Sequence, residues 1–121
     1  MRQEGTKKSS GMPIPHAERA EVDIRKLSDY CLSLDHGEGK HKARLFAAAL
    51  GITADDAPDL RAALLEIILT HDAQLGLRDE YGQRYTVDFL FEWRGRRAVI
   101  RSGWIIEHES DTPRLTTCYP L

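Results

Sequence analysis

The hydrophobic residues of this 121-residue chain change their spacing along the sequence, and this change limits the folds that the chain can adopt. Leu60, Leu64 and Ile68 recur at the spacing of one helix face. From residue 84 onward apolar and polar residues alternate, as at Tyr85 and Val87, which is the pattern of a half-buried strand. Helices that precede strands predict an α+β domain. In it the N-terminal helices pack on one face of a C-terminal antiparallel β-meander of three to four strands.

Capping and turn residues divide the chain into its expected elements. Helices are expected over residues 23–33, 41–50 and 53–71. Asp23 is the expected N-cap of the first helix, and Gly51 is expected to end the second. Strands are expected over residues 84–93, 97–108 and 114–121. A short hairpin turn is expected around Gly95, between the first two strands.

The alternation assigns each strand residue to one of two sheet faces. The face expected against the helices carries Tyr85, Val87, Phe89, Ile100, Ser102, Trp104, Leu115, Thr117 and Tyr119. The opposite face carries Arg84, Asp88, Arg97, Arg101, Arg114, Thr116 and Cys118. The sequence therefore predicts a sheet with one apolar face and one polar, arginine-rich face.

Composition narrows the class of protein. Residues 1–11 are small, polar or charged, and they are expected to form a tag-like or disordered leader before a single α+β domain at residues 12–121. The formal net charge of −2 argues against tight non-specific binding to DNA or RNA, because such binding depends on neutralised phosphates, but it leaves room for an enzyme with a local basic patch. No apolar run reaches the roughly 18 residues of a membrane span, so a cytoplasmic protein without a membrane partner is expected. Cys31 and Cys118 are expected to be buried small hydrophobes in a reducing compartment rather than a disulfide.

The stretch GEGKHKARLF, residues 37–46, is the first candidate site. Lys40, His41 and Lys42 follow a glycine-containing loop at an expected helix start. Free backbone N–H groups at a helix start attract anions, and a histidine titrates near neutral pH. The same cluster is also typical of a solvated turn. Two interpretations therefore stay open: an anion site with His41 in acid–base work, or an exposed charged loop.

The arginine-rich sheet face is the second candidate. Arg84 and Asp88 lie on the same side of one strand, and Arg101 and Arg114 are expected on neighbouring strands. Arginine binds phosphate through two parallel hydrogen bonds, but such a face is also typical of cross-strand ion pairs in solvent. Ser102 has no nucleophile-elbow motif around it and is expected to be a hydroxyl satisfied inside the core. No spacing of His or Cys residues predicts a metal site or a cofactor.

Four blocks of the sequence occur together in order: GKHKARLF, DEYGQRYTVDF, RSGWII and PRLTTCYPL. Through these blocks residues 12–121 resemble a family of small bacterial proteins known only as a domain of unknown function. More loosely, helices followed by a meander with a Ser/Thr-x-Trp strand resemble the barnase–EndoU–colicin–RelE class of ribonuclease toxins. That resemblance implies RNA cleavage by 2′-hydroxyl transesterification, without a metal or another cofactor.

The resemblance to ribonuclease toxins also implies roles for individual residues and a partner. His41 and Lys42 would form the acid–base and electrostatic pair, and Arg84 and Arg101 would hold the phosphate. The substrate-binding or supporting residues would be Lys40, Asp88, Ser102, Arg114 and Thr117. Such an enzyme would need a neutralising antitoxin or immunity protein. The rival interpretation is a non-catalytic interaction or immunity-type domain that binds a protein through the arginine face or a free strand edge.

Overall fold

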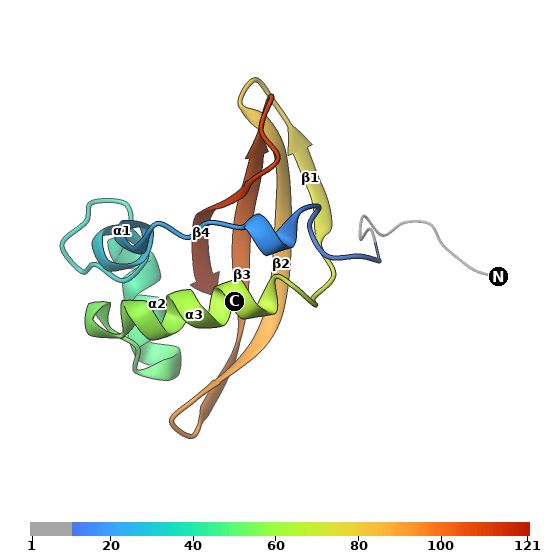
Figure 1. Cartoon of the computed structure of the whole chain (residues 1–121). Helices are drawn as coiled ribbons and strands as arrows, with labels where there is room; N and C mark the ends of the chain where they lie inside the picture. Colours follow the sequence, from blue (N-terminus) through green and yellow to red (C-terminus); the bar gives the residue numbers. More distant parts are fainter. Residues whose placement is uncertain (1–10) are drawn as a thin grey trace.

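The computed structural model describes residues 11–121, so residues 1–10 of the predicted leader lie outside the described residues. Its helices α1 to α3 lie on one side of a four-stranded antiparallel sheet with the order β1-β2-β3-β4 (Figure 1). The predicted α+β architecture, with helices first and a meander second, is confirmed. The long β2–β3 hairpin extends beyond the helices at one end of the sheet (Figure 1).

The first helical segment is shorter and less regular than predicted. Helix α1, Ile24–Lys26, continues directly into a π-helical turn, η2, Leu27–Cys31. The predicted N-cap is confirmed, because the Asp23 carboxylate accepts the backbone N–H of Arg25 at 3.0 Å. The Leu32 N–H donates to the Leu27 carbonyl, five residues earlier, which is the π-helical pattern. This wide turn ends the helix at Cys31 instead of residue 33.

The remaining helices follow their capping residues. Helix α2, Lys40–Leu50, ends at Gly51, which has φ 73° and confirms the predicted left-handed stop. A short 3₁₀ turn, η3, Ala54–Asp56, leads into α3, Ala57–Ile67. Thr53 and Asp56 form a capping box before α3, so the third predicted helix begins in two steps.

The sheet consists of β1, Gln74–Arg78; β2, Gly82–Trp93; β3, Arg96–Glu107; and β4, Pro113–Pro120. Strands β2 and β3 pair without interruption from Gly82↔Glu107 to Trp93↔Arg96. The predicted hairpin turn is confirmed at Arg94 and Gly95, which both have positive φ, as a two-residue hairpin turn requires. Strand β1 has no counterpart among the strand ranges expected from the sequence. All five of its residues are exposed, so it lacks the alternation that marks the other strands.

Strand β4 contains a β-bulge that the strict alternation did not predict. Gly103 pairs with Thr117, but its neighbour Trp104 pairs with Leu115, so Thr116 has no partner across the strand. A Cβ on Gly103 would lie 3.1 Å from the Thr116 hydroxyl and 3.2 Å from the Thr117 methyl carbon. Both threonine side chains therefore lie over this glycine.

The bulge reverses the predicted faces of the second half of β4. The prediction that Thr117 and Tyr119 face the core is wrong, because Tyr119 pairs with Arg101 on the polar face. The prediction that Cys118 lies on the polar face is also wrong, because it is fully buried and pairs with Ser102. The physical reason is the extra residue, which shifts the two-residue side-chain period by one position.

The core lies between the helices and the apolar sheet face, where Phe46, Leu64, Val87 and Trp104 are all buried. Ser102 is the one polar residue among the described residues that is buried with them. Its hydroxyl donates to the Val87 carbonyl at 2.8 Å and accepts the Trp104 indole N–H at 2.9 Å. The prediction of a satisfied hydroxyl in the core is confirmed.

Replacement of Ser102 by alanine is expected to lower the free energy of unfolding by about 1–3 kcal/mol, because the buried Trp104 N–H loses its acceptor. Chemical denaturation of wild type and Ser102→Ala, followed by tryptophan fluorescence, measures this difference. Ser110→Ala, at an exposed serine, is the control and should stay within about 0.5 kcal/mol of wild type. An unfolding midpoint of Ser102→Ala equal to that of the control would contradict this account of the core.

Candidate functional site

The predicted arginines of the polar sheet face are engaged in ion pairs. Arg101 donates from Nε and Nη2 to the two carboxylate oxygens of Asp88, at 2.9 and 2.8 Å, across the β2–β3 pair. Arg114 donates to Glu107 at 2.8 Å. The sequence left open whether this face binds phosphate or forms cross-strand ion pairs, and the structure contains the ion pairs. These guanidinium groups are therefore partly neutralised in the free protein.

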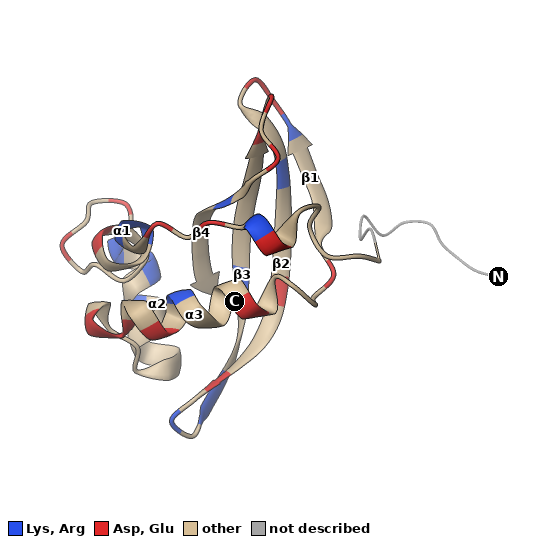
Figure 2. Cartoon of the chain, viewed as in Figure 1, with Lys and Arg blue, Asp and Glu red and all other residues tan. Residues whose placement is uncertain are grey.

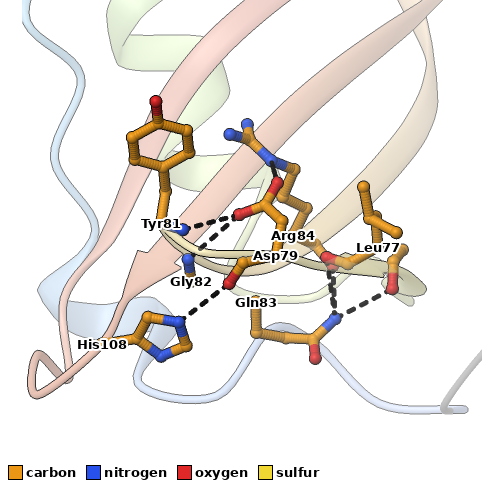
Figure 3. A network of polar contacts seen from close by, with 8 residues as sticks. Leu77, Asp79, Tyr81, Gly82, Gln83, Arg84 and His108 are labelled. Atoms are coloured by element: carbon orange, nitrogen blue, oxygen red, sulfur yellow. Dashed lines mark hydrogen bonds and ion pairs between the residues drawn. The ribbon is translucent and has the colours of Figure 1, made fainter.

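Arg84 belongs to a network that holds the turn between β1 and β2 (Figure 3). It donates to the Asp79 carboxylate at 2.8 Å, and the same carboxylate accepts the backbone N–H groups of Tyr81 and Gly82. The Asp79 carbonyl lies 2.8 Å from His108 Nε2, which ties the turn to the end of β3. The hydrogen bond from Arg84 lowers the pKa of Asp79, and the Tyr81 N–H adds to this effect. Arg84 thus has a structural role in this turn.

His41 and Lys40 lie on the first turn of α2. The His41 side chain is exposed and Lys40 is half-buried. Neither side chain forms a hydrogen bond, ion pair or ring contact with any residue in the range 11–121. His41 therefore has no direct contact with Arg84 or Arg101. The site predicted from these three residues is not formed by direct contacts between them.

Lys42 is the predicted site residue with the most defined surroundings. Its Nζ donates to the Tyr30 hydroxyl at 3.0 Å and lies 5.0 Å from the centre of the Tyr30 ring. It also lies 5.8 Å from the centre of the Tyr119 ring, which the β4 bulge places on the polar face. The hydrogen bond to Tyr30 raises the pKa of Lys42, so the amine stays protonated at neutral pH. Lys42 therefore provides a fixed positive charge beside two phenol rings.

A cleft of about 580 Å³ lies next to this lysine–tyrosine pair. Tyr30, His36 and Glu38 line it from η2 and the loop before α2, Lys26 lines it from α1, and Thr116 lines it from the β4 bulge. Its size suits a small polar ligand or one unit of a polymer. The cleft thus combines residues from three parts of the chain that are far apart in sequence.

His36 is held in one orientation at this cleft. Its Nδ1 accepts the backbone N–H groups of Glu38 at 3.0 Å and Gly39 at 2.9 Å. The ring meets the Tyr30 ring edge-on, with 4.9 Å between centroids. Since Nδ1 is an acceptor, the neutral ring carries its proton on Nε2, which is then a donor for a ligand.

Lys26, which lines the cleft, and Lys42, which contacts Tyr30 beside it, have no carboxylate partner among the described residues. Lys26 and Lys42 both lie over the Tyr30 ring, with Lys26 Nζ 5.7 Å from its centre. The nearby Arg25 is paired with Asp23 at 2.8 Å. The pKa of Asp23 falls to about 2 because Arg25 donates to its carboxylate, so this pair stays intact at neutral pH. The positive charges that remain for a ligand are those of the two lysines.

The chain matches one protein-family model over most of its length. Residues 13–121 match the family model described as a domain of unknown function (DUF6883). The chain belongs to this family. No curated protein and no solved structure matches the chain significantly.

Within this DUF6883 chain, residues 11–121 contain no helix of the length and apolarity that a membrane crossing requires. The same residues contain no group of three or more His, Cys, Asp or Glu side chains placed to hold a metal ion. Cys31 and Cys118 are both buried and free, as predicted, and the Cys118 N–H donates to Cys31 Sγ at 3.4 Å. The Thr117 hydroxyl is buried beside them without a hydrogen-bond partner among the described residues.

Sequence reasoning missed Tyr30, His36, Lys26 and Glu38 as site residues. A signal for His36 was present, because it lies in the same glycine-containing loop as the predicted cluster. A histidine followed by glycines is suited to accept backbone N–H groups of a tight turn, whereas His41 lies on a regular helix. The signal for Tyr30 was only its position beside the buried stripe of the first helix.

Gly39 fixes the geometry of the cleft, because a Cβ on this residue would overlap the Tyr30 carbonyl oxygen. Gly39→Ala is therefore expected to destabilise the protein by about 1–3 kcal/mol through overpacking. Gly37→Ala is the matched control in the same loop, since a Cβ there meets no atom within 4 Å and should change the stability by less than about 0.5 kcal/mol. Thermal unfolding of the two variants measures both effects. Equal stabilities would show that η2 and the start of α2 are not in close contact.

The Asp79 network predicts a pH-dependent contribution to stability. The folded-state pKa of Asp79 is lowered, so the stabilisation is fully present above the unfolded pKa of about 3.9 and is lost as the pH falls through the folded value. The unfolding temperature of Asp79→Asn should therefore lie below that of wild type at pH 7, and the two should converge as the pH falls toward about 2. A difference that stays constant over this pH range would contradict the ion pair with Arg84.

Proposed function

We propose that this protein is a metal-independent ribonuclease that cleaves RNA by attack of the 2′-hydroxyl on the adjacent phosphodiester, and that the cleft beside Tyr30 is its active site. The observation that carries this proposal is the hydrogen bond from the Lys42 ammonium to the Tyr30 hydroxyl, at 3.0 Å, next to a histidine with a fixed donor nitrogen. This arrangement supplies hydrogen-bond donors and positive charge to a phosphate without a metal ion.

The donor set of the cleft is suited to a phosphodiester. The Nε2–H of His36 and the ammonium groups of Lys26 and Lys42 would bind the non-bridging oxygens of the phosphate. These groups are donors and favour an anion, whereas the Asp29 carboxylate, which also lines the cleft, opposes one. The sheet arginines are less suited to this task, because Arg84 and Arg101 would first have to leave Asp79 and Asp88.

Residues of the cleft would carry out both proton transfers of the proposed reaction. The Glu38 carboxylate takes the proton of the 2′-hydroxyl, whose oxygen forms a bond to phosphorus. The bond between phosphorus and the 5′-oxygen breaks, and the Tyr30 hydroxyl donates its proton to that oxygen. Lys42 stabilises the negative charge that develops on the Tyr30 oxygen. The products are a 2′,3′-cyclic phosphate and a 5′-hydroxyl, and water returns the proton from Glu38 to Tyr30.

The remaining predicted residues have different places in this proposal. His41 stays a predicted acid–base residue on the helix that carries Lys42, and Lys40 a predicted substrate contact. Ser102 supports the core, and Thr117, whose hydroxyl is buried, is the neighbour in β4 of Thr116, which lines the cleft. As a ribonuclease the protein would act on cellular RNA, so a neutralising antitoxin or immunity protein is part of the proposal.

The activity is tested with purified protein and a labelled RNA in buffer that contains EDTA. Wild type should release fragments that end in a 2′,3′-cyclic phosphate. Tyr30→Phe and His36→Gln should lower the cleavage rate by about 10²-fold or more, because each removes a proton donor at the phosphate. Arg44→Gln, on the exposed side of α2, is the control and should cleave like wild type.

The results decide whether the protein cleaves RNA and which residues form the site. Intact RNA with folded wild-type protein would overturn the ribonuclease proposal. Cleavage that Tyr30→Phe and His36→Gln leave unchanged but His41→Ala abolishes would move the site to the start of α2. Circular dichroism of every variant separates a loss of chemistry from a loss of fold.

A further inference from the structure

A second concave surface lies on the other side of the segment that carries Tyr30. This groove, of about 480 Å³, runs between residues 28–35 and the elements α2 and η3. Its apolar lining includes Leu32, Leu34, Ala43, Ala47 and Ile52. Leu34 is 61 % exposed and Ala47 is also exposed, whereas Leu32, Ala43 and Ile52 are buried. The groove is therefore an apolar surface that the described part of the chain leaves open.

The charged residues that line the groove all have the same sign. They are Asp29, Asp35 and Asp55, and no lysine, arginine or histidine lines it. None of these three carboxylates forms an ion pair with a residue in the range 11–121. At this end of the molecule acidic segments in the loop next to α1 and at the start of α3 lie beside basic segments of α1 and α2, and the tip of the β2–β3 hairpin is basic (Figure 2).

Other carboxylates, among them Glu66 and Asp72, also lack an ion pair among the described residues, so the groove is distinguished by the single sign of its charged lining. Asp56, Asp79, Asp88 and Glu107 each have an arginine partner within the chain. Asp29 accepts the Ser28 hydroxyl at 3.0 Å and attracts Arg25, whereas Asp35 and Asp55 have no ion pair or side-chain hydrogen bond among the described residues. An occupant that buries an aliphatic side chain in the groove and carries flanking lysines or arginines would satisfy both the apolar lining and the carboxylates.

We propose that this groove is a docking site for a basic segment of a partner protein, with an aliphatic side chain inserted between α2 and residues 28–35. On α2, Ala43 is buried and Ala47, four residues later, is exposed in the groove, so the anchor would pack against Ala47 and Leu34. Asp29 lines both the groove and the Tyr30 cleft, so a bound partner would border the proposed active site. The docking site rests on the groove alone and does not require the ribonuclease activity.

The test uses two fluorescent helical peptides of about 15 residues, both with leucine at every fourth position. One peptide carries lysine at the flanking positions and the other carries glutamate. Fluorescence anisotropy with the full chain should show binding of the lysine peptide at least about tenfold tighter than that of the glutamate peptide. Equal affinities, or no binding of either peptide, would overturn the proposal.

Variants of the chain separate groove binding from general attraction of charge. Asp35→Lys should weaken binding of the lysine peptide by about tenfold, whereas Asp72→Lys, with the same charge change outside the groove, should have a smaller effect. Ala47→Phe should fill the groove and weaken binding to a similar extent, while Ala48→Phe, one residue further along α2 and outside the groove lining, should not. Binding that Ala47→Phe leaves unchanged would reduce the interaction to surface charge and overturn the docking site.

Light scattering of the free protein completes the test. A monomer that stays monomeric in Ala47→Phe supports a partner protein as the occupant. A wild-type dimer that Ala47→Phe dissociates would show that a second copy fills the groove, and would overturn the proposal of a different partner. Cleavage of RNA by the same variants reports on the Tyr30 cleft separately, so failure of the docking site and failure of the ribonuclease proposal are distinguishable.

Discussion

The candidate site depends on the close approach of Gly39 to the backbone of Tyr30. Because Gly39 has no side chain, the start of α2 lies directly against the Tyr30 carbonyl. The same glycine donates its N–H to His36, which fixes the imidazole at the mouth of the cleft. Three residues later, nearly one helical turn, Lys42 donates to the Tyr30 hydroxyl. One residue without a Cβ therefore brings a phenol, an imidazole and an ammonium group together.

A second glycine allows a close approach of side chains in the sheet. Gly103 leaves room for the side chains of both Thr116 and Thr117, and this permits the bulge in β4. The bulge sends Cys118 into the core beside Cys31 and leaves Tyr119 on the polar face, within reach of Lys42. The cleft is thus closed on one side by a strand whose side-chain order is changed at a single residue.

The sequence was sufficient to predict the parts of the fold that follow from regular periods. Strands β2 and β3 alternate strictly, and their expected ranges agree with the structure to within two residues at either end. The period of two could not predict the faces of β4, because it assumes that no residue is inserted. A glycine inside a strand is a known mark of a bulge, so Gly103 carried the missing signal. Strand β1 is short, and its only alternating apolar residues, Leu75 and Leu77, are exposed on an edge, so no buried face marks it.

The candidate site was harder to predict, because residue type does not reveal which charges are already paired. Asp88 and Arg101 are cross-strand neighbours only in the observed register, and Asp79 reaches Arg84 only through the β1–β2 turn. Residue type also did not show which histidine is held by hydrogen bonds, His36 in the loop before α2 or His41 on its first turn. Backbone N–H groups of a turn hold His36, whereas His41 points from a helix into solvent.

The contrast between arginines and lysines explains how an acidic chain provides a site for an anion. The sheet arginines are paired with carboxylates, so a phosphate that binds them must displace an existing ion pair. Lys26 and Lys42 lie instead over the Tyr30 ring, which attracts a cation but accepts few of its hydrogen bonds. Their remaining N–H donors stay available to a ligand oxygen. A local positive charge of this kind needs no net positive charge on the protein, because partly buried charges act over a short range and are weakly screened by salt.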